Sequence, residues 1–153
     1  MDKDKTYQLL VKQVESLIDG ENNPVGQLAN AGALLHETMH WWWTGFYLVK
    51  DGELQLGPFQ GPIACYRIKK GRGVCGTAWQ ENRTIVVPDV EQFPGHIACS
   101  SLSRSEIVVP LHDLSGAVIG VLDIDSKDLA TFDDVDARWL NEIVRVIEQK
   151  VKL

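Results

Sequence analysis

The side chains of this sequence that could do chemistry are, first, its cysteines, Cys65, Cys75 and Cys99. Cys65 and Cys99 lie in segments expected to be loops, where a core side chain is not needed, whereas Cys75 is equally well explained as a small core residue. A cysteine close to an imidazole, a guanidinium and backbone amides is partly ionised at neutral pH, and the thiolate is the nucleophile. His96 and Arg104 flank Cys99 in this way. The segment therefore predicts a reactive sulfur.

Two chemistries compete for such a sulfur. Acyl transfer would pair Cys99 with a base, for which His96 is the candidate. Redox chemistry needs a second cysteine to capture the oxidised sulfur, and spacing alone leaves Cys65 and Cys99 equal candidates for the attacking thiol. A zinc site is disfavoured, because the chain contains no C-x-x-C or C-x₄-C pair. We therefore expect no bound metal.

Three carboxylates can supply a proton to a reaction at sulfur. Asp123 and Asp125 are two residues apart in the segment VLDIDS, so a strand there would point both side chains to the same face. Glu106 begins the apolar run EIVVPL, which we expect to pair with that strand. Crowded carboxylates raise one another's pKa, so at least one can stay protonated at neutral pH and act as a general acid. The same cluster would attract a cationic group such as an amine.

The aromatic segment 41-WWWTGFY-47 predicts a strand, since five of its seven residues are aromatic. Alternation places Trp43 and Tyr47 on one face and Trp42 and Phe46 on the other. We expect Phe46 in the core. One of the two faces can form the wall of a pocket for a small apolar group, and a methyl group on sulfur suits an aromatic wall.

The glycine-rich segment 71-GRGVCG-76 matches the dinucleotide pattern G-x-G-x-x-G. That fingerprint requires a preceding strand within a parallel βαβ unit, whereas here a basic loop precedes it and the neighbouring strands are expected to form hairpins. The glycines instead predict a tight turn into a short helix over 74–82. The free N–H groups at the start of that helix can hold an anion such as a carboxylate.

The elements that must position these side chains follow from periodicity and turn signals. Helical spacing covers 5–18 and a second helix from Pro24 to Met39, and a last helix is expected after Thr131, which we take as its N-cap. One hairpin turns at Asp51-Gly52, and a second joins EIVVPLHD to AVIGVLDID. The order predicts an α+β fold: a central antiparallel sheet with the N- and C-terminal helices on one face and the active-site loops on the other, in one domain spanning 1–153.

Composition excludes several classes of partner. The chain is 44% hydrophobic and 24% charged, as globular proteins are, and its net charge of −6 and pI of about 5.1 argue against nucleic acid and anionic membranes. The first residues, MDKDKTYQLL, do not form a signal-peptide pattern, and no apolar run reaches transmembrane length. We expect a cytoplasmic protein in which any disulfide is transient and functional.

Four segments together, WWWTGFYLV, GPIACYRIKKGRGVCGTAW, VPDVEQFPGHIACSSLSRSEIVVPL and GVLDIDS, closely resemble the free methionine-(R)-sulfoxide reductases, a family with the GAF fold. The resemblance implies reduction of free L-methionine-(R)-sulfoxide, as a defence against oxidative stress, with no bound cofactor and with thioredoxin or another dithiol as the reductant. GAF domains commonly dimerise through their terminal helices, so a homodimer is a candidate assembly. A non-catalytic GAF sensor of small molecules and a cysteine hydrolase using His96 are the alternatives.

The resemblance also implies a role for each matching residue. Cys99 corresponds to the catalytic nucleophile, Cys65 to the resolving cysteine that forms a disulfide with it, and Cys75 to the third cysteine of the family. The other matching positions are carboxylates that hold the substrate and help to polarise the sulfoxide, and aromatics that line its methyl-bearing end: Glu106, Asp123 and Asp125, and Trp43 and Tyr47.

Overall fold

The computed structural model describes residues 1–96 and 102–153. Within these ranges the helices are α1 (Lys3–Ile18), α2 (Pro24–Met39), α3 (Gly73–Glu81) and α4 (Asp134–Lys150), with a 3₁₀ turn at Val90–Gln92. The strands are β1 (Trp43–Lys50), β2 (Glu53–Gln60), β3 (Arg67–Ile68), β4 (Ile85–Val87), β5 (Ser105–His112) and β6 (Val118–Ser126). None of the helices in the described ranges is long and apolar enough to cross a bilayer.

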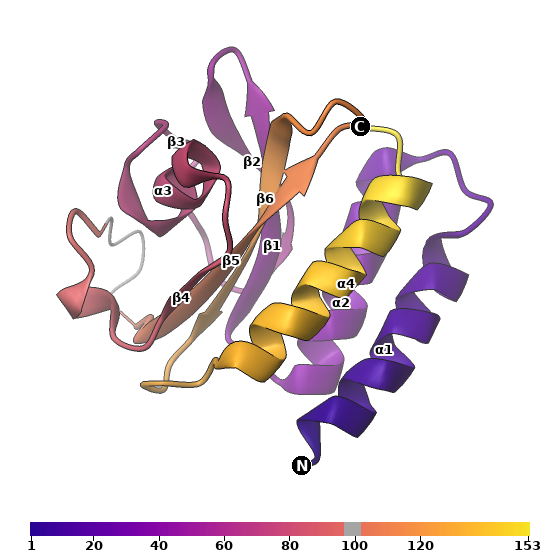
Figure 1. Cartoon of the computed structure of the whole chain (residues 1–153), viewed down its shortest axis with the longest axis horizontal. Helices are drawn as coiled ribbons and strands as arrows, with labels where there is room; N and C mark the ends of the chain where they lie inside the picture. The colour runs from indigo at the N-terminus through magenta and orange to yellow at the C-terminus, as the bar shows by residue number, and fades with distance from the viewer. Residues whose placement is uncertain (97–101) are drawn as a thin grey trace.

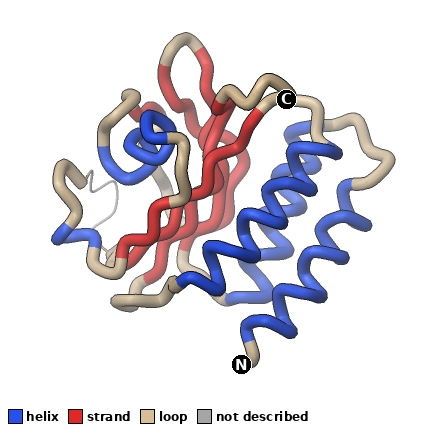
Figure 2. Tube along the Cα trace, viewed as in Figure 1, coloured by secondary structure: helices blue, strands red, loops and turns tan. Residues whose placement is uncertain are grey.

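The six strands of the described residues form one sheet in the order β3-β2-β1-β6-β5-β4, and each neighbouring pair is antiparallel. Helices α2 and α4 cover one face, with α1 outside them, while the short helix α3 lies on the opposite side (Figure 1). Figure 2 shows the same division, with the long helices on one side of the strands and the loops around α3 on the other. This is the predicted α+β arrangement.

The sheet buries apolar side chains on both faces, and strand alternation decides which residue goes to which core. Toward the long helices the strands contribute Phe46, Ile107, Val109, Leu122 and Ile124. Toward α3 they contribute Trp43, Tyr47, Val108 and Val121. The second core is therefore the one in which the predicted aromatic wall lies.

The first hairpin turns where the sequence indicates. Asp51 and Gly52 both adopt left-handed backbone conformations, with φ of 54° and 77°, as the favoured two-residue hairpin turn requires. In the second hairpin the Asp113 carboxylate accepts hydrogen bonds from the backbone N–H groups of Ser115 and Ala117. Both turns fix the register of the strands that follow them.

The start of α4 corrects one prediction. Asp133, not Thr131, is the N-cap: its side chain accepts from the backbone N–H groups of Val135 and Asp136, and Asp136 accepts in return from the N–H of Asp133. Thr131 instead donates its hydroxyl hydrogen to Ser126 Oγ at 2.6 Å. A carboxylate two residues closer to the helix is the better partner for its N-terminal dipole.

The glycine-rich segment serves a turn and close packing. Gly71 has a φ of 81°, and a Cβ added at Gly76 would lie 2.4 Å from the carbonyl oxygen of Lys69. Because the flanking strands are antiparallel, the parallel βαβ context of a dinucleotide fold does not arise here. Helix α3 begins directly after this turn and carries Cys75 in its first turn.

Candidate active site

A pocket of about 70 Å³ opens on the α3 side of the sheet, which is room for several water molecules or a small molecule. The strands provide Trp43, Tyr47, Glu106, Asp123 and Asp125 to its lining, and α3 provides Gly73, Val74 and Cys75. Trp42, Ile63, Ile68, Arg72, His96 and Ser103 complete it. Among the described residues, every one predicted from the sequence for the site lines this pocket except Cys65.

The aromatic wall also holds a loop in place. The rings of Trp43 and Tyr47 stack with their centroids 6.0 Å apart. The indole N–H of Trp43 donates to the carbonyl oxygen of Pro62 at 3.0 Å, and the Tyr47 hydroxyl donates to that of Cys65 at 2.9 Å. Strand β1 therefore fixes the backbone of the loop that carries Cys65 beside the pocket.

Trp42 departs from the predicted alternation. It lines the pocket together with Trp43 and Tyr47 instead of sharing a face with Phe46. The reason is that β1 begins at Trp43, so the two-residue period of a strand does not extend to Trp42. Its ring lies below the Lys127 ammonium, 5.8 Å from the nitrogen to the ring centroid.

The three carboxylates meet because of the strand register. Glu106 of β5 is directly opposite Asp125 of β6, and Asp123 is two residues away on the same face of β6. Glu106 and Asp123 are each only 6% exposed. Ser103 donates its hydroxyl hydrogen to Asp125 Oδ1 at 3.2 Å. The predicted common acidic pocket is confirmed in geometry, with Ser103 as an added member.

Burial and mutual repulsion raise the pKa values of this cluster. Burial, and then the negative charge of Asp123, raise the pKa values of Glu106 and Asp125 well above the usual range. Burial also raises the pKa of Asp123, but hydrogen bonds from Glu106, Asp125 and Cys75 oppose that rise. The hydrogen bonds around Asp123 thus favour its ionised form, whereas the charge of Asp123 favours the protonated forms of Glu106 and Asp125.

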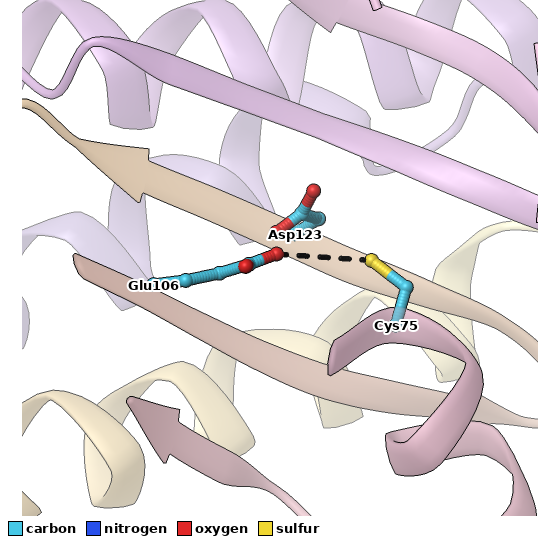
Figure 3. Close-up of side chains that lie close together, drawn as sticks. All are labelled: Cys75, Glu106 and Asp123. Atoms are coloured by element: carbon cyan, nitrogen blue, oxygen red, sulfur yellow. Dashed lines mark hydrogen bonds between the residues drawn. The ribbon is translucent and has the colours of Figure 1, made fainter. Parts of the chain in front are cut away.

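Cys75 projects from α3 toward the carboxylates (Figure 3). Its Sγ lies 4.0 Å from Glu106 Oε2, and the side chain is 3% exposed and free of any disulfide. Burial, followed by the charges of Asp123, Glu106 and Asp125, raises its pKa well above the ordinary value. A buried thiol among acids is a poor nucleophile, because the thiolate is the reactive form.

His96 lies over the carboxylates. Its Nε2 is 4.0 Å from Glu106 Oε1, and burial lowers its pKa. A neutral imidazole beside a protonated acid is not an ion pair. Cys99, the nucleophile that the resemblance implies, lies outside the described residues.

Sequence reasoning missed several residues that line the site, among them Trp42 and Ser103. Trp42 belongs to the aromatic run, but the exact start of β1 decides its orientation. Ser103 is one of several serines between Cys99 and Glu106, and residue type gives no reason to prefer it. Only the antiparallel pairing that brings it beside Asp125 selects it.

Comparison with known proteins agrees with this geometry. The model of the GAF domain family matches residues 22–151. The chain is 56% identical to GAF domain-containing protein A of Dictyostelium discoideum, over 95% of this chain and 92% of the relative. It is 47% identical to the free methionine-R-sulfoxide reductase of Escherichia coli, over 97% of this chain and 90% of the relative.

A solved structure extends the match to three dimensions. The free methionine-R-sulfoxide reductase of Neisseria meningitidis, determined in complex with its substrate, superimposes with a TM-score of 0.96 at 53% identity. The match covers 98% of this chain and 90% of that one. The chain belongs to the GAF-domain family and, within it, to the free methionine-R-sulfoxide reductases.

Proposed function

We propose that this protein reduces free L-methionine-(R)-sulfoxide to L-methionine, using Cys99 as the attacking thiolate. The observation that carries the proposal is the meeting of protonated carboxyl groups and an aromatic wall in one small pocket. A sulfoxide oxygen needs a proton in order to leave, and the methyl group beside it needs an apolar surface. Relatives named for this activity, from E. coli and N. meningitidis, support the proposal.

Each end of the substrate has a matching group in the pocket. The ionised carboxylate of Asp123 attracts the ammonium group, and the free N–H groups where α3 begins, at Gly73 and Val74, attract the carboxylate. The methyl group lies against Trp43 and Tyr47. A residue within a peptide has no free ammonium group, so the acidic cluster favours the free amino acid.

In the first chemical stage the sulfoxide oxygen passes from one sulfur to another: its bond to the substrate sulfur breaks and a bond to the Cys99 sulfur forms, so the S–S bond made by the attack is transient. The Cys99 thiolate attacks the sulfoxide sulfur while a protonated carboxyl group, Glu106 or Asp125, donates its proton to the oxygen. The oxygen is transferred to the enzyme, methionine leaves, and Cys99 becomes a sulfenic acid. Because burial raises the pKa values of both acids well above the usual range, they keep a proton to higher pH than ordinary carboxyl groups do.

The second stage restores the enzyme. The thiol of Cys65 attacks the sulfenic sulfur, water leaves, and a disulfide forms between Cys65 and Cys99. The net change is one sulfoxide and two thiols converted to methionine, a disulfide and water. A dithiol protein such as thioredoxin then reduces the disulfide. The proposal is supported by Cys65, which is disulfide-bonded in this structure and is held beside the pocket by Tyr47.

The test is a chiral assay of free methionine sulfoxide. Reduced protein is mixed with the racemic compound, and the loss of each epimer is followed by chiral separation. We expect the (R) epimer to disappear, the (S) epimer to persist, and Cys99→Ser to be inactive. Tight binding without consumption of either epimer would instead make the protein a sensor. Full activity of Cys99→Ser would exclude Cys99 as the nucleophile.

A further inference from the structure

A thiol and two carboxylates that are far apart in the sequence form one compact group in the fold. We call Cys75, Glu106 and Asp123 the acid–thiol cluster; they come from α3, β5 and β6 (Figure 3). One ligand atom from each residue lies within 4.8 Å of the other two, and all three side chains are buried. Their spacing in the sequence forms no metal-binding motif, so only the tertiary structure shows this group.

One atom of the cluster is unsatisfied. Asp123 Oδ1 is buried and has no hydrogen-bond partner among the described residues. The carboxyls of Glu106 and Asp125 and the thiol of Cys75 interact with Asp123, and each can donate to it only while it keeps its proton. A buried carboxylate oxygen without a partner is costly, and a cation placed among these groups would satisfy it.

The distances are close to those of a zinc site. Zinc binds thiolate sulfur at about 2.3 Å and nitrogen or carboxylate oxygen at about 2.0–2.2 Å, so two ligand atoms of a tetrahedral site are roughly 3.5 Å apart. Cys75 Sγ lies 4.0 Å from Glu106 Oε2 and every pair of ligand atoms in the cluster is within 4.8 Å, so inward movements of roughly half to one and a quarter ångströms would close the site. The cluster supplies three protein ligands, the number that zinc sites with one open position use.

The types of ligand select the metal. Two carboxylates alone would suit Mg²⁺ or Ca²⁺, but the thiolate of Cys75 favours Zn²⁺ among the redox-inactive cations. The thiol and the protonated carboxyl groups would release their protons to solvent when the metal enters, so affinity must rise with pH.

We infer that the acid–thiol cluster is a Zn²⁺ site, and that Zn²⁺ bound there inhibits the protein by excluding the substrate. The metal would occupy Asp123, the proposed partner of the substrate ammonium, and would remove the proton that the sulfoxide oxygen needs. The inhibitory part rests on the proposed function, whereas the binding part does not. Zn²⁺ is then a reversible inhibitor that binds in the pocket and not a resident cofactor.

Binding is tested without any assay of activity. The double variant Cys65→Ser/Cys99→Ser leaves Cys75 as the remaining one of the chain's three cysteines, so any thiolate–metal signal comes from the cluster. We expect it to bind one Zn²⁺ in equilibrium dialysis. It should also give a thiolate-to-metal charge-transfer absorption with Co²⁺, with protons released in both cases.

Substitutions in this background then locate the metal. Cys75→Ala and Asp123→Asn should each weaken Zn²⁺ binding by at least about tenfold. Loss of a residue that only orients a metal ligand already costs about 10–100-fold in affinity, and loss of a ligand itself should cost no less. His40→Ala, at an exposed histidine outside the pocket, should bind as tightly as its parent. Circular dichroism checks that each variant is folded, and Cys75→Ser provides a second, nearly isosteric change at the thiol.

Competition with the substrate tests the inhibitory part. With the wild-type protein, free methionine-(R)-sulfoxide should weaken Zn²⁺ binding, and Zn²⁺ should raise the KM of the reaction without changing kcat. Zn²⁺ binding without any reductase activity would leave the site intact and remove the proposed function. Activity with no Zn²⁺ binding, or binding unchanged in Cys75→Ala and Asp123→Asn, would overturn this inference alone.

Discussion

Glu106 and Asp125 are directly opposite each other on the neighbouring strands β5 and β6. Two carboxyl groups in such a pair cannot both ionise cheaply, and burial adds to the penalty. The register of the hairpin formed by β5 and β6 therefore places a proton donor at the pocket. Four predictions follow from this pair and from the groups around it.

Replacing Glu106 by glutamine should slow the first chemical step. The amide keeps the shape of the side chain but is a far weaker acid, and a positioned general acid contributes about 10²–10⁴-fold. Rapid-quench measurement of methionine release should show a loss in this range, with disulfide formation after it little changed. Asp125→Asn is the matched comparison: the variant with the larger loss identifies the acid. A slower disulfide step with normal methionine release would remove Glu106 from this role.

Cys65→Ser should separate the two stages of the reaction. Without the resolving thiol, the enzyme should still release about one methionine per molecule, because oxygen transfer needs only the attacking sulfur. Turnover with thioredoxin should be lost, and mass spectrometry should find a sulfenic acid. Normal cycling of this variant would mean that Cys75 or another thiol is the resolver.

The raised pKa of Glu106 also makes a prediction about stability. Between the ordinary glutamate value of about 4.3 and the raised folded-state pKa, the folded protein binds one more proton than the unfolded chain. The contribution of Glu106 to stability therefore falls as pH rises through this interval. Glu106→Gln should raise the Tm at pH 8 by a few degrees and leave it nearly unchanged near pH 4. Glu91→Gln, at an exposed glutamate, is the control and should give no such pH-dependent gap.

Tyr47→Phe should affect the loop that carries Cys65. The change removes the hydroxyl that donates to the Cys65 carbonyl at 2.9 Å and keeps the ring. A hydrogen bond of this kind contributes about 0.5–1.5 kcal/mol, so disulfide formation should slow by roughly two- to tenfold. Tyr66→Phe, at an exposed ring in the same loop, should cycle at the parent rate. Equal slowing of both stages would show that the hydroxyl acts on the substrate instead.

Local signals predicted much of this fold. Asp51-Gly52 specified a turn because few other pairs adopt two left-handed conformations in succession, and the spacing of Asp123 and Asp125 placed both on one face because a strand has a period of two. The predictions were wrong where the orientation or role of a residue depended on the exact residue at which a strand or helix begins. Trp42 lies one residue before β1, and Asp133 displaced Thr131 as the cap of α4.

The interior of the site was less accessible to sequence reasoning. That Cys75 faces Glu106 depends on how α3 packs on the sheet, which no short-range pattern records. The same holds for Ser103, which reaches Asp125 only through the pairing of β5 with β6. Long-range packing, and not residue type, decides these contacts.

The rings of Trp43 and Tyr47 face the pocket, while their polar atoms hold the carbonyl groups of Pro62 and Cys65. Replacing either ring by a smaller side chain, in order to admit a bulkier amino acid, would also remove a hydrogen bond that holds the neighbouring loop. Such a change would impair the regeneration of the reduced enzyme together with its substrate selectivity. Redesign is better begun at Trp42, whose ring lies under the Lys127 ammonium and whose side chain makes neither of these hydrogen bonds.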